Sequence, residues 1–123
     1  MKTILIVEND KNQLLLYEYE LSLEGYNIIT AKDGYEALKK VKEHFSDLIV
    51  MDIILPGMDG VELMGRILSE RKNIPIIINT AYGGYKDNFM TWSADTYIIK
   101  SSDLSELKNM VKELLGKTEC RTP

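Results

Sequence analysis

Five short apolar runs, separated by longer amphipathic segments, constrain the fold of this chain most strongly. Several of the runs are continuously apolar, which is typical of strands buried on both faces of a parallel sheet. The run around 26–31 is more mixed, so we expect that strand at or near a sheet edge. The pattern predicts a doubly wound α/β domain, in which five parallel strands alternate with five helices. The apolar runs are 4–7, 28–29, 48–51, 76–78 and 97–99.

Paired polar residues mark the expected starts of the helices. An aspartate followed three residues later by Glu or Gln can satisfy the first backbone N–H groups of a helix reciprocally. Gly25 fits the end of the first helix, where a left-handed residue is favoured. The expected fourth helix, roughly 85–92, has the weakest signals. The pairs are Asp10 with Gln13, Asp33 with Glu36, Asp59 with Glu62, and Asp103 with Glu106.

Size and composition favour a single cytoplasmic domain. A chain of 123 residues fits one hydrophobic core, and no apolar run approaches the ~20 residues that span a bilayer. The N-terminus lacks the layout of a signal peptide, and the single cysteine, Cys120, cannot form an internal disulfide. The net charge of −4 argues against direct binding to nucleic acid. We expect one domain over 1–116 and a short C-terminal tail over 117–123, with no output domain.

Polar side chains directly follow four of the five apolar runs. In an open parallel sheet the carboxyl ends of the strands meet at one rim, where ligands bind. The sequence therefore predicts that carboxylates, an amide, a hydroxyl and an ammonium converge there. The residues are Glu8, Asn9 and Asp10 after the first run, Asp52 after the third, Thr80 and Ala81 after the fourth, and Lys100 after the fifth.

This set of side chains suits phosphoryl transfer. Two carboxylates held close together repel each other unless a cation lies between them, and hard oxygen ligands suit Mg²⁺. A bound Mg²⁺ would neutralise an incoming phosphoryl group, while Thr80 and Lys100 would supply a hydrogen bond and a positive charge. Phosphoryl transfer depends mainly on such positioning and charge neutralisation. Asp52 would then be the nucleophile and would form an aspartyl phosphate.

Four stretches, in order and on the expected strands, resemble the receiver domains of two-component response regulators. They are ILIVEND at 4–10, LIVMDIILPGMDG at 48–60, NTAY at 79–82 and YIIK at 97–100. The resemblance extends over about 2–115. It implies a flavodoxin-like sheet in the order 2-1-3-4-5. It also implies a phosphorylation-dependent signalling switch, which accepts its phosphoryl group from a histidine kinase or phosphotransfer protein.

The resemblance also implies a role for each matching position. The downstream partner would bind the face formed by the fourth helix, the fifth strand and the fifth helix, and the protein would be a monomer or a phosphorylation-linked dimer. It would be no enzyme beyond self-phosphorylation and slow self-dephosphorylation. The implied phosphoacceptor is Asp52; the Mg²⁺ ligands are Glu8, Asn9, Asp52 and the backbone carbonyl of Ile54; the phosphoryl contacts are Thr80, Ala81 and Lys100; and the switch residues are Thr80 and Tyr97.

Three departures from the family pattern carry expectations of their own. Asn9 stands where the family usually has a second acid, so we expect weaker Mg²⁺ binding than at an all-acid site. Ser101 stands where proline is common, and a cis peptide before serine costs about 3 kcal/mol, which favours a trans bond. Ile54 and Tyr82 offer no carboxylate or amide to orient a water molecule, so we expect slow self-dephosphorylation.

Other functions stay open at this point. The chain could be a degenerate receiver that binds partners without being phosphorylated, which only Asn9 and Ser101 favour. A Mg²⁺-dependent phosphohydrolase commonly needs a second acid two residues after its nucleophile, where this chain has Ile54. A flavin-binding flavodoxin needs a hydroxyl- and glycine-rich phosphate loop after the first strand, whereas the acidic 8–10 stretch would repel phosphate in the absence of a metal.

Overall fold

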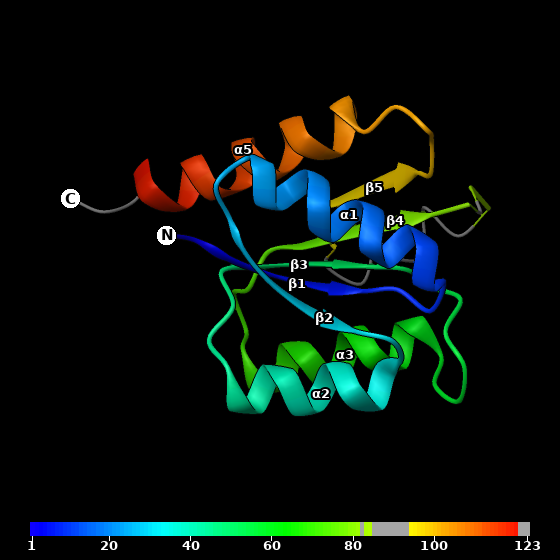
Figure 1. The fold of residues 1–123 in the computed structure, drawn as a ribbon. Helices are drawn as coiled ribbons and strands as arrows, with labels where there is room; N and C mark the ends of the chain where they lie inside the picture. The colour runs from blue at the N-terminus through cyan, green and yellow to red at the C-terminus, as the bar shows by residue number, and fades with distance from the viewer. Residues whose placement is uncertain (82, 85–93, 121–123) are drawn as a thin grey trace.

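The computed structural model describes residues 1–81, 83–84 and 94–120 (Figure 1). Its strands form one parallel sheet in the order β2-β1-β3-β4-β5, which confirms the predicted order. Four helices lie in the described ranges, and the helix predicted at 85–92 falls outside them. The elements are β1 (Thr3–Val7), α1 (Lys11–Leu23), β2 (Asn27–Ala31), α2 (Gly34–Glu43), β3 (Leu48–Met51), α3 (Gly60–Glu70), β4 (Ile76–Thr80), β5 (Thr96–Ile99) and α5 (Ser105–Cys120).

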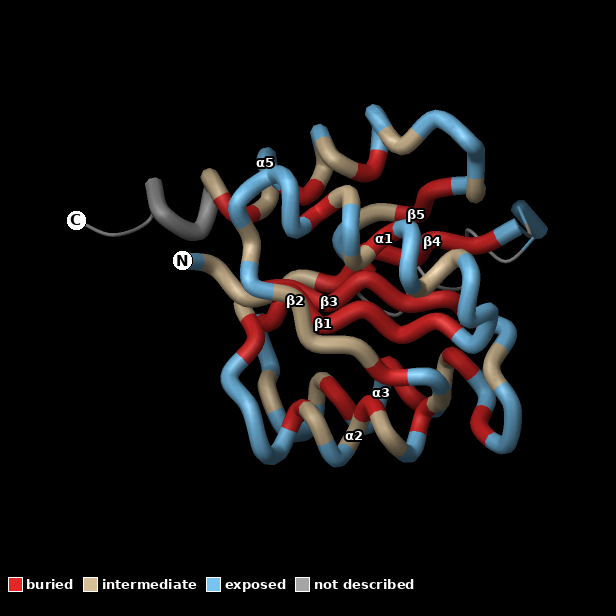
Figure 2. The backbone as a smooth tube through the Cα atoms, viewed as in Figure 1, coloured by how far each residue is buried: buried red, intermediate tan, exposed pale blue. Residues whose placement is uncertain are grey.

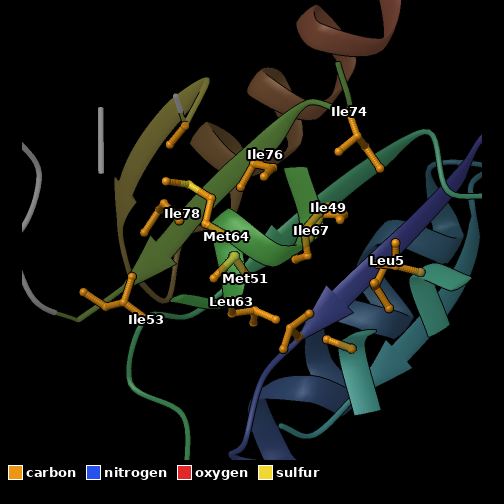
Figure 3. Packing of buried hydrophobic residues seen from close by; sticks show 14 of the residues in the cluster. Leu5, Ile49, Met51, Ile53, Leu63, Met64, Ile67, Ile74, Ile76 and Ile78 are labelled. Carbon is orange, nitrogen blue, oxygen red and sulfur yellow. The ribbon is translucent and has the colours of Figure 1, made fainter. Parts of the chain in front are cut away.

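The helices cover the sheet from both faces. Helices α1 and α5 lie on one face, and α2 and α3 lie on the other (Figure 1). Two separate apolar clusters fill these layers, because successive strand residues point to opposite faces. Figure 3 shows Leu63, Met64 and Ile67 of α3 against the strands. On the other face, Leu107 and Val111 of α5 pack with Ile98.

The sheet is most deeply buried at its centre. Every residue of β3 and β4 is buried, whereas most of β2 is only partly buried (Figure 2). The prediction that β2 lies at an edge is therefore confirmed. The continuous apolar runs reflect strands that have neighbours on two sides and helices on two faces.

The predicted caps position the helices. The side chain of Asp10 accepts hydrogen bonds from the backbone N–H groups at the start of α1, and Asp33 and Asp59 do the same for α2 and α3. Gly25, just beyond α1, has a φ of +95°, as predicted for a left-handed stop. The predicted tail, 117–123, overlaps the last turn of α5. None of the helices in the described ranges is long and apolar enough to cross a membrane.

Candidate functional site

Three charged residues lie at the rim where the strands end. The backbone N–H groups of Glu8, Asp52 and Lys100 each donate to a carbonyl of the neighbouring strand, at 3.0, 3.0 and 2.7 Å. The sheet hydrogen bonding therefore continues one residue beyond β1, β3 and β5. These backbone positions are as rigid as the sheet, and the strand arrows in Figure 1 point toward this rim.

The Lys100 ammonium joins the two carboxylates. Its Nζ lies 2.6 Å from Glu8 Oε1 and 2.6 Å from Asp52 Oδ2. The side chains of Glu8 and Asp52 are only 4% and 8% exposed, and that of Lys100 is 14% exposed. The Lys100 ammonium thus pairs with two buried carboxylates. Together the three side chains carry a net charge of −1.

The surroundings of Lys100 keep it protonated. Burial by itself lowers the pKa of the ammonium, but the hydrogen bonds and charges of Asp52 and Glu8 outweigh that effect and hold the pKa above its usual value. Lys100 is therefore a permanent cation at neutral pH.

Backbone donors bind the second oxygen of each carboxylate. Ile54 N–H donates to Asp52 Oδ1 at 3.1 Å, and Asp10 N–H donates to Glu8 Oε2 at 3.2 Å. Both oxygens of each group are therefore hydrogen-bonded. The side chain of Asp10 turns away to cap α1, as predicted, and does not join the carboxylate pair.

Asn9 lies next to this cluster but is exposed. Its Nδ2 donates to the carbonyl of Lys32 at 3.2 Å, in the turn between β2 and α2. The amide nitrogen is therefore engaged outside the cluster. The amide oxygen is the atom through which Asn9 could bind a metal ion.

The donor set fits a hard cation. Across the described part of the chain, no three His, Cys, Asp or Glu side chains are grouped so that they could hold a metal ion. A metal ion held by Glu8 and Asp52 would therefore need further oxygen donors of another kind, such as an amide or a backbone carbonyl. The two carboxylates already direct one oxygen each to a common cation, the Lys100 ammonium, and oxygen donors of this kind suit Mg²⁺.

The other predicted residues lie on β4 and β5 or directly after β4. Thr80 is the fully buried last residue of β4, and Ala81 follows it on the surface. Tyr97 of β5 is 8% exposed and packs in the apolar cluster on the α2–α3 side of the sheet. The Lys100–Ser101 peptide is trans, because the described residues contain no cis bond.

A buried polar pair beside the rim was not predicted. Tyr17 of α1 and Asn79 of β4 are each 4% exposed and lie near one another, and the Tyr17 hydroxyl donates to Gln13 Oε1 at 3.3 Å. Burial holds the pKa of Tyr17 above its usual value, although the nearby Asn79 amide opposes this. A signal was available, because Asn79 continues the apolar run 76–78 and a buried amide needs a partner.

Comparison with known proteins identifies the family. Residues 4–112 match the response regulator receiver domain family. The chain is 36% identical to the alkaline phosphatase synthesis transcriptional regulatory protein PhoP of Bacillus subtilis, over 99% of this chain and 52% of PhoP. The chain belongs to the response regulator receiver domain family. It spans about half the length of the curated relatives it matches.

Solved structures agree closely with the fold. The response regulator TrrA of Thermotoga maritima, in complex with Mg²⁺-BeF, is 44% identical with a TM-score of 0.88, over 93% of this chain and 99% of TrrA. A second structure, in which TrrA is in complex with the histidine kinase ThkA, gives 44% identity and a TM-score of 0.86, over 94% of this chain and 99% of TrrA.

Proposed function

We propose that this domain is a phosphorylation-dependent switch of a two-component system, which accepts a phosphoryl group on Asp52. The observation that carries the proposal is the buried carboxylate of Asp52 at the end of β3, sharing the Lys100 ammonium with Glu8. The similarity of this chain to TrrA also supports the proposal, because one TrrA structure is a complex with Mg²⁺-BeF and another is a complex with a histidine kinase.

The proposed reaction is an in-line displacement at phosphorus. A carboxylate oxygen of Asp52 attacks the phosphoryl group of a phosphohistidine, so that a P–O bond forms while the P–N bond breaks. The imidazole nitrogen leaves with the bonding electron pair. Lys100 pairs with the phosphoryl oxygens, Thr80 donates a hydrogen bond, and the small side chain of Ala81 leaves room beside them.

Mg²⁺ would be held by Glu8, Asp52, the Asn9 amide and the Ile54 carbonyl. When bound, the ion supplies positive charge that offsets the phosphoryl group. Without it, the excess negative charge of the Glu8–Lys100–Asp52 cluster opposes the approach of an anion. This charge balance is the reason that we expect phosphorylation to require Mg²⁺.

Phosphorylation would change the surface of the domain on its β5 side. We infer that Thr80 moves toward the bound phosphoryl group and that Tyr97 responds, which changes the face that includes β5 and α5. The helix expected at 85–92 would complete this face but lies outside the described residues. We infer that the protein acts in the cytoplasm and that its phosphoryl donor is a histidine kinase or phosphotransfer protein. The receiver domain would extend over 1–116. It acts as a monomer or as a phosphorylation-linked dimer on a downstream protein.

Incubation with acetyl phosphate and Mg²⁺ tests the proposal. The mass of the intact protein should increase by one phosphoryl group, and the increase should be lost without Mg²⁺ and in Asp52→Asn. Absence of labelling in the wild type would favour the unphosphorylated interaction module instead. Rapid, continuing hydrolysis of excess acetyl phosphate would favour a phosphohydrolase.

A further inference from the structure

The turn between β2 and α2 contacts both loops that carry uncharged donors of the proposed metal site. On one side, the carbonyl of Lys32 accepts a hydrogen bond from Asn9 Nδ2 at 3.2 Å. On the other, the hydroxyl of Tyr35 donates to the carbonyl of Gly57 at 3.0 Å, in the loop that follows Asp52. Residues 32–36, which we call the β2–α2 turn, therefore connect the loop after β1 to the loop after β3.

The β2–α2 turn is itself held firmly. Glu36 N–H donates to Asp33 Oδ1 at 2.8 Å, and Lys32 N–H donates in return to Glu36 Oε1 at 3.1 Å. This reciprocal capping closes the first turn of α2 over the end of β2. The two contacts to the metal-binding loops therefore start from a rigid point.

Tyr35 contacts the loop after β3 through its ring as well as through its hydroxyl. A Cβ atom added to Gly57 would lie 3.1 Å from a ring carbon of Tyr35, and Gly57 has a φ of +77°. The ring thus lies directly against a left-handed glycine. Beside it, a Cβ atom on Gly34 would lie 3.0 Å from the side chain of Met58. The start of α2 therefore holds two consecutive residues of the loop.

The contact between Tyr35 and Gly57 is separated from the proposed metal site by only a short stretch of backbone. Ile54, whose carbonyl is a proposed Mg²⁺ ligand, lies three residues before Gly57, and its N–H is bound to Asp52 Oδ1. At the far end, a Cβ atom on Gly60 would come within 2.8 Å of Ile53 Cα, so the loop closes tightly on itself. A closed loop of this kind passes a displacement at Gly57 to Ile54.

We propose that Tyr35 is a positioning residue for the Mg²⁺ site, holding the loop that carries the Ile54 carbonyl, while Lys32 holds Asn9 from the same turn. The proposal rests on the proposed function of the site. It also gives a reason for the amide at position 9, because an aspartate could not donate to the Lys32 carbonyl. Groups that fix metal ligands from outside affect metal affinity without touching the ion.

Tyr35→Phe tests the proposal, with Tyr19→Phe as the matched control. Tyr19 lies on α1 and is 62% exposed, against 60% for Tyr35. In a calorimetric titration with Mg²⁺, the Kd of Tyr35→Phe should be about threefold to tenfold higher than that of the wild type. This is the effect expected from losing one hydrogen bond on a metal-binding loop. Tyr35→Ala, which also removes the ring, should weaken binding further, and Tyr19→Phe should bind as the wild type does.

A purely structural role for Tyr35 predicts a different outcome. Under our proposal, the Mg²⁺ concentration that half-saturates phosphorylation by acetyl phosphate rises with the Kd, while the rate at saturating Mg²⁺ and the urea midpoint without Mg²⁺ stay near those of the control. An unchanged Kd in Tyr35→Phe, or equal weakening in Tyr19→Phe, would overturn it. If the wild type neither binds Mg²⁺ nor becomes phosphorylated, the proposed function fails and this inference fails with it.

Discussion

Replacing Lys100 by methionine removes the ammonium but keeps most of the volume of the side chain. The buried side chains of Glu8 and Asp52 would then face each other with no cation between them. Removing one partner of a buried ion pair typically costs about 3–5 kcal/mol, because the remaining charge is left uncompensated. Here the remaining charge is doubled, so we expect a loss in this range at pH 7.

The free energy of unfolding of Lys100→Met should therefore fall below that of the wild type by about 3–5 kcal/mol at pH 7. Urea denaturation at pH 7 without Mg²⁺ measures this difference. Lys39→Met is the matched control, because Lys39 is exposed on α2, and it should change stability by less than about 0.5 kcal/mol. Adding Mg²⁺ should restore part of the stability of Lys100→Met by binding the carboxylates that the ammonium leaves. A loss below about 1 kcal/mol at pH 7 would show that the two carboxylates do not need the Lys100 ammonium.

Three further substitutions test other parts of the site. Asn9→Asp should bind Mg²⁺ more tightly in a calorimetric titration, because it adds a charge, although it gives up the hydrogen bond to Lys32; equal affinities would contradict this expectation. Ile54→Asn should lose its acyl phosphate faster than the wild type, measured as decay of the phosphorylated mass, because an amide can orient water; slower decay would be contrary evidence. Tyr17→Phe should lower the free energy of unfolding by about 0.5–1.5 kcal/mol in urea, because it removes the hydrogen bond that the buried hydroxyl donates to Gln13; an unchanged midpoint would show that this hydroxyl contributes nothing to stability.

The fold could be predicted because the central strands are buried on every side. The apolar runs at 48–51 and 76–78 belong to strands with neighbours on both edges and helices on both faces, so almost every side chain had to be apolar. The mixed composition of β2 identified the edge for the same reason. The acidic caps Asp10, Asp33 and Asp59 predicted where helices begin, because those backbone N–H groups need acceptors.

The strand order predicts which residues lie at the rim, but not how their side chains interact. Glu8, Asp52 and Lys100 were expected at one rim, since parallel strands bring their carboxyl ends together. That a single ammonium joins both carboxylates depends on side-chain conformation, which strand order does not determine. The contact of Tyr35 with Gly57 joins two loops that are distant in the sequence, and no local pattern indicates it.

We have proposed that Asp52 accepts a phosphoryl group with the help of Mg²⁺. The most direct test is to locate the modification by peptide mass spectrometry after incubation with acetyl phosphate and Mg²⁺. We expect one phosphoryl group on Asp52, absent in Asp52→Asn and strongly reduced when Mg²⁺ is chelated. A phosphoryl group on another residue, or undiminished labelling of Asp52→Asn, would contradict it.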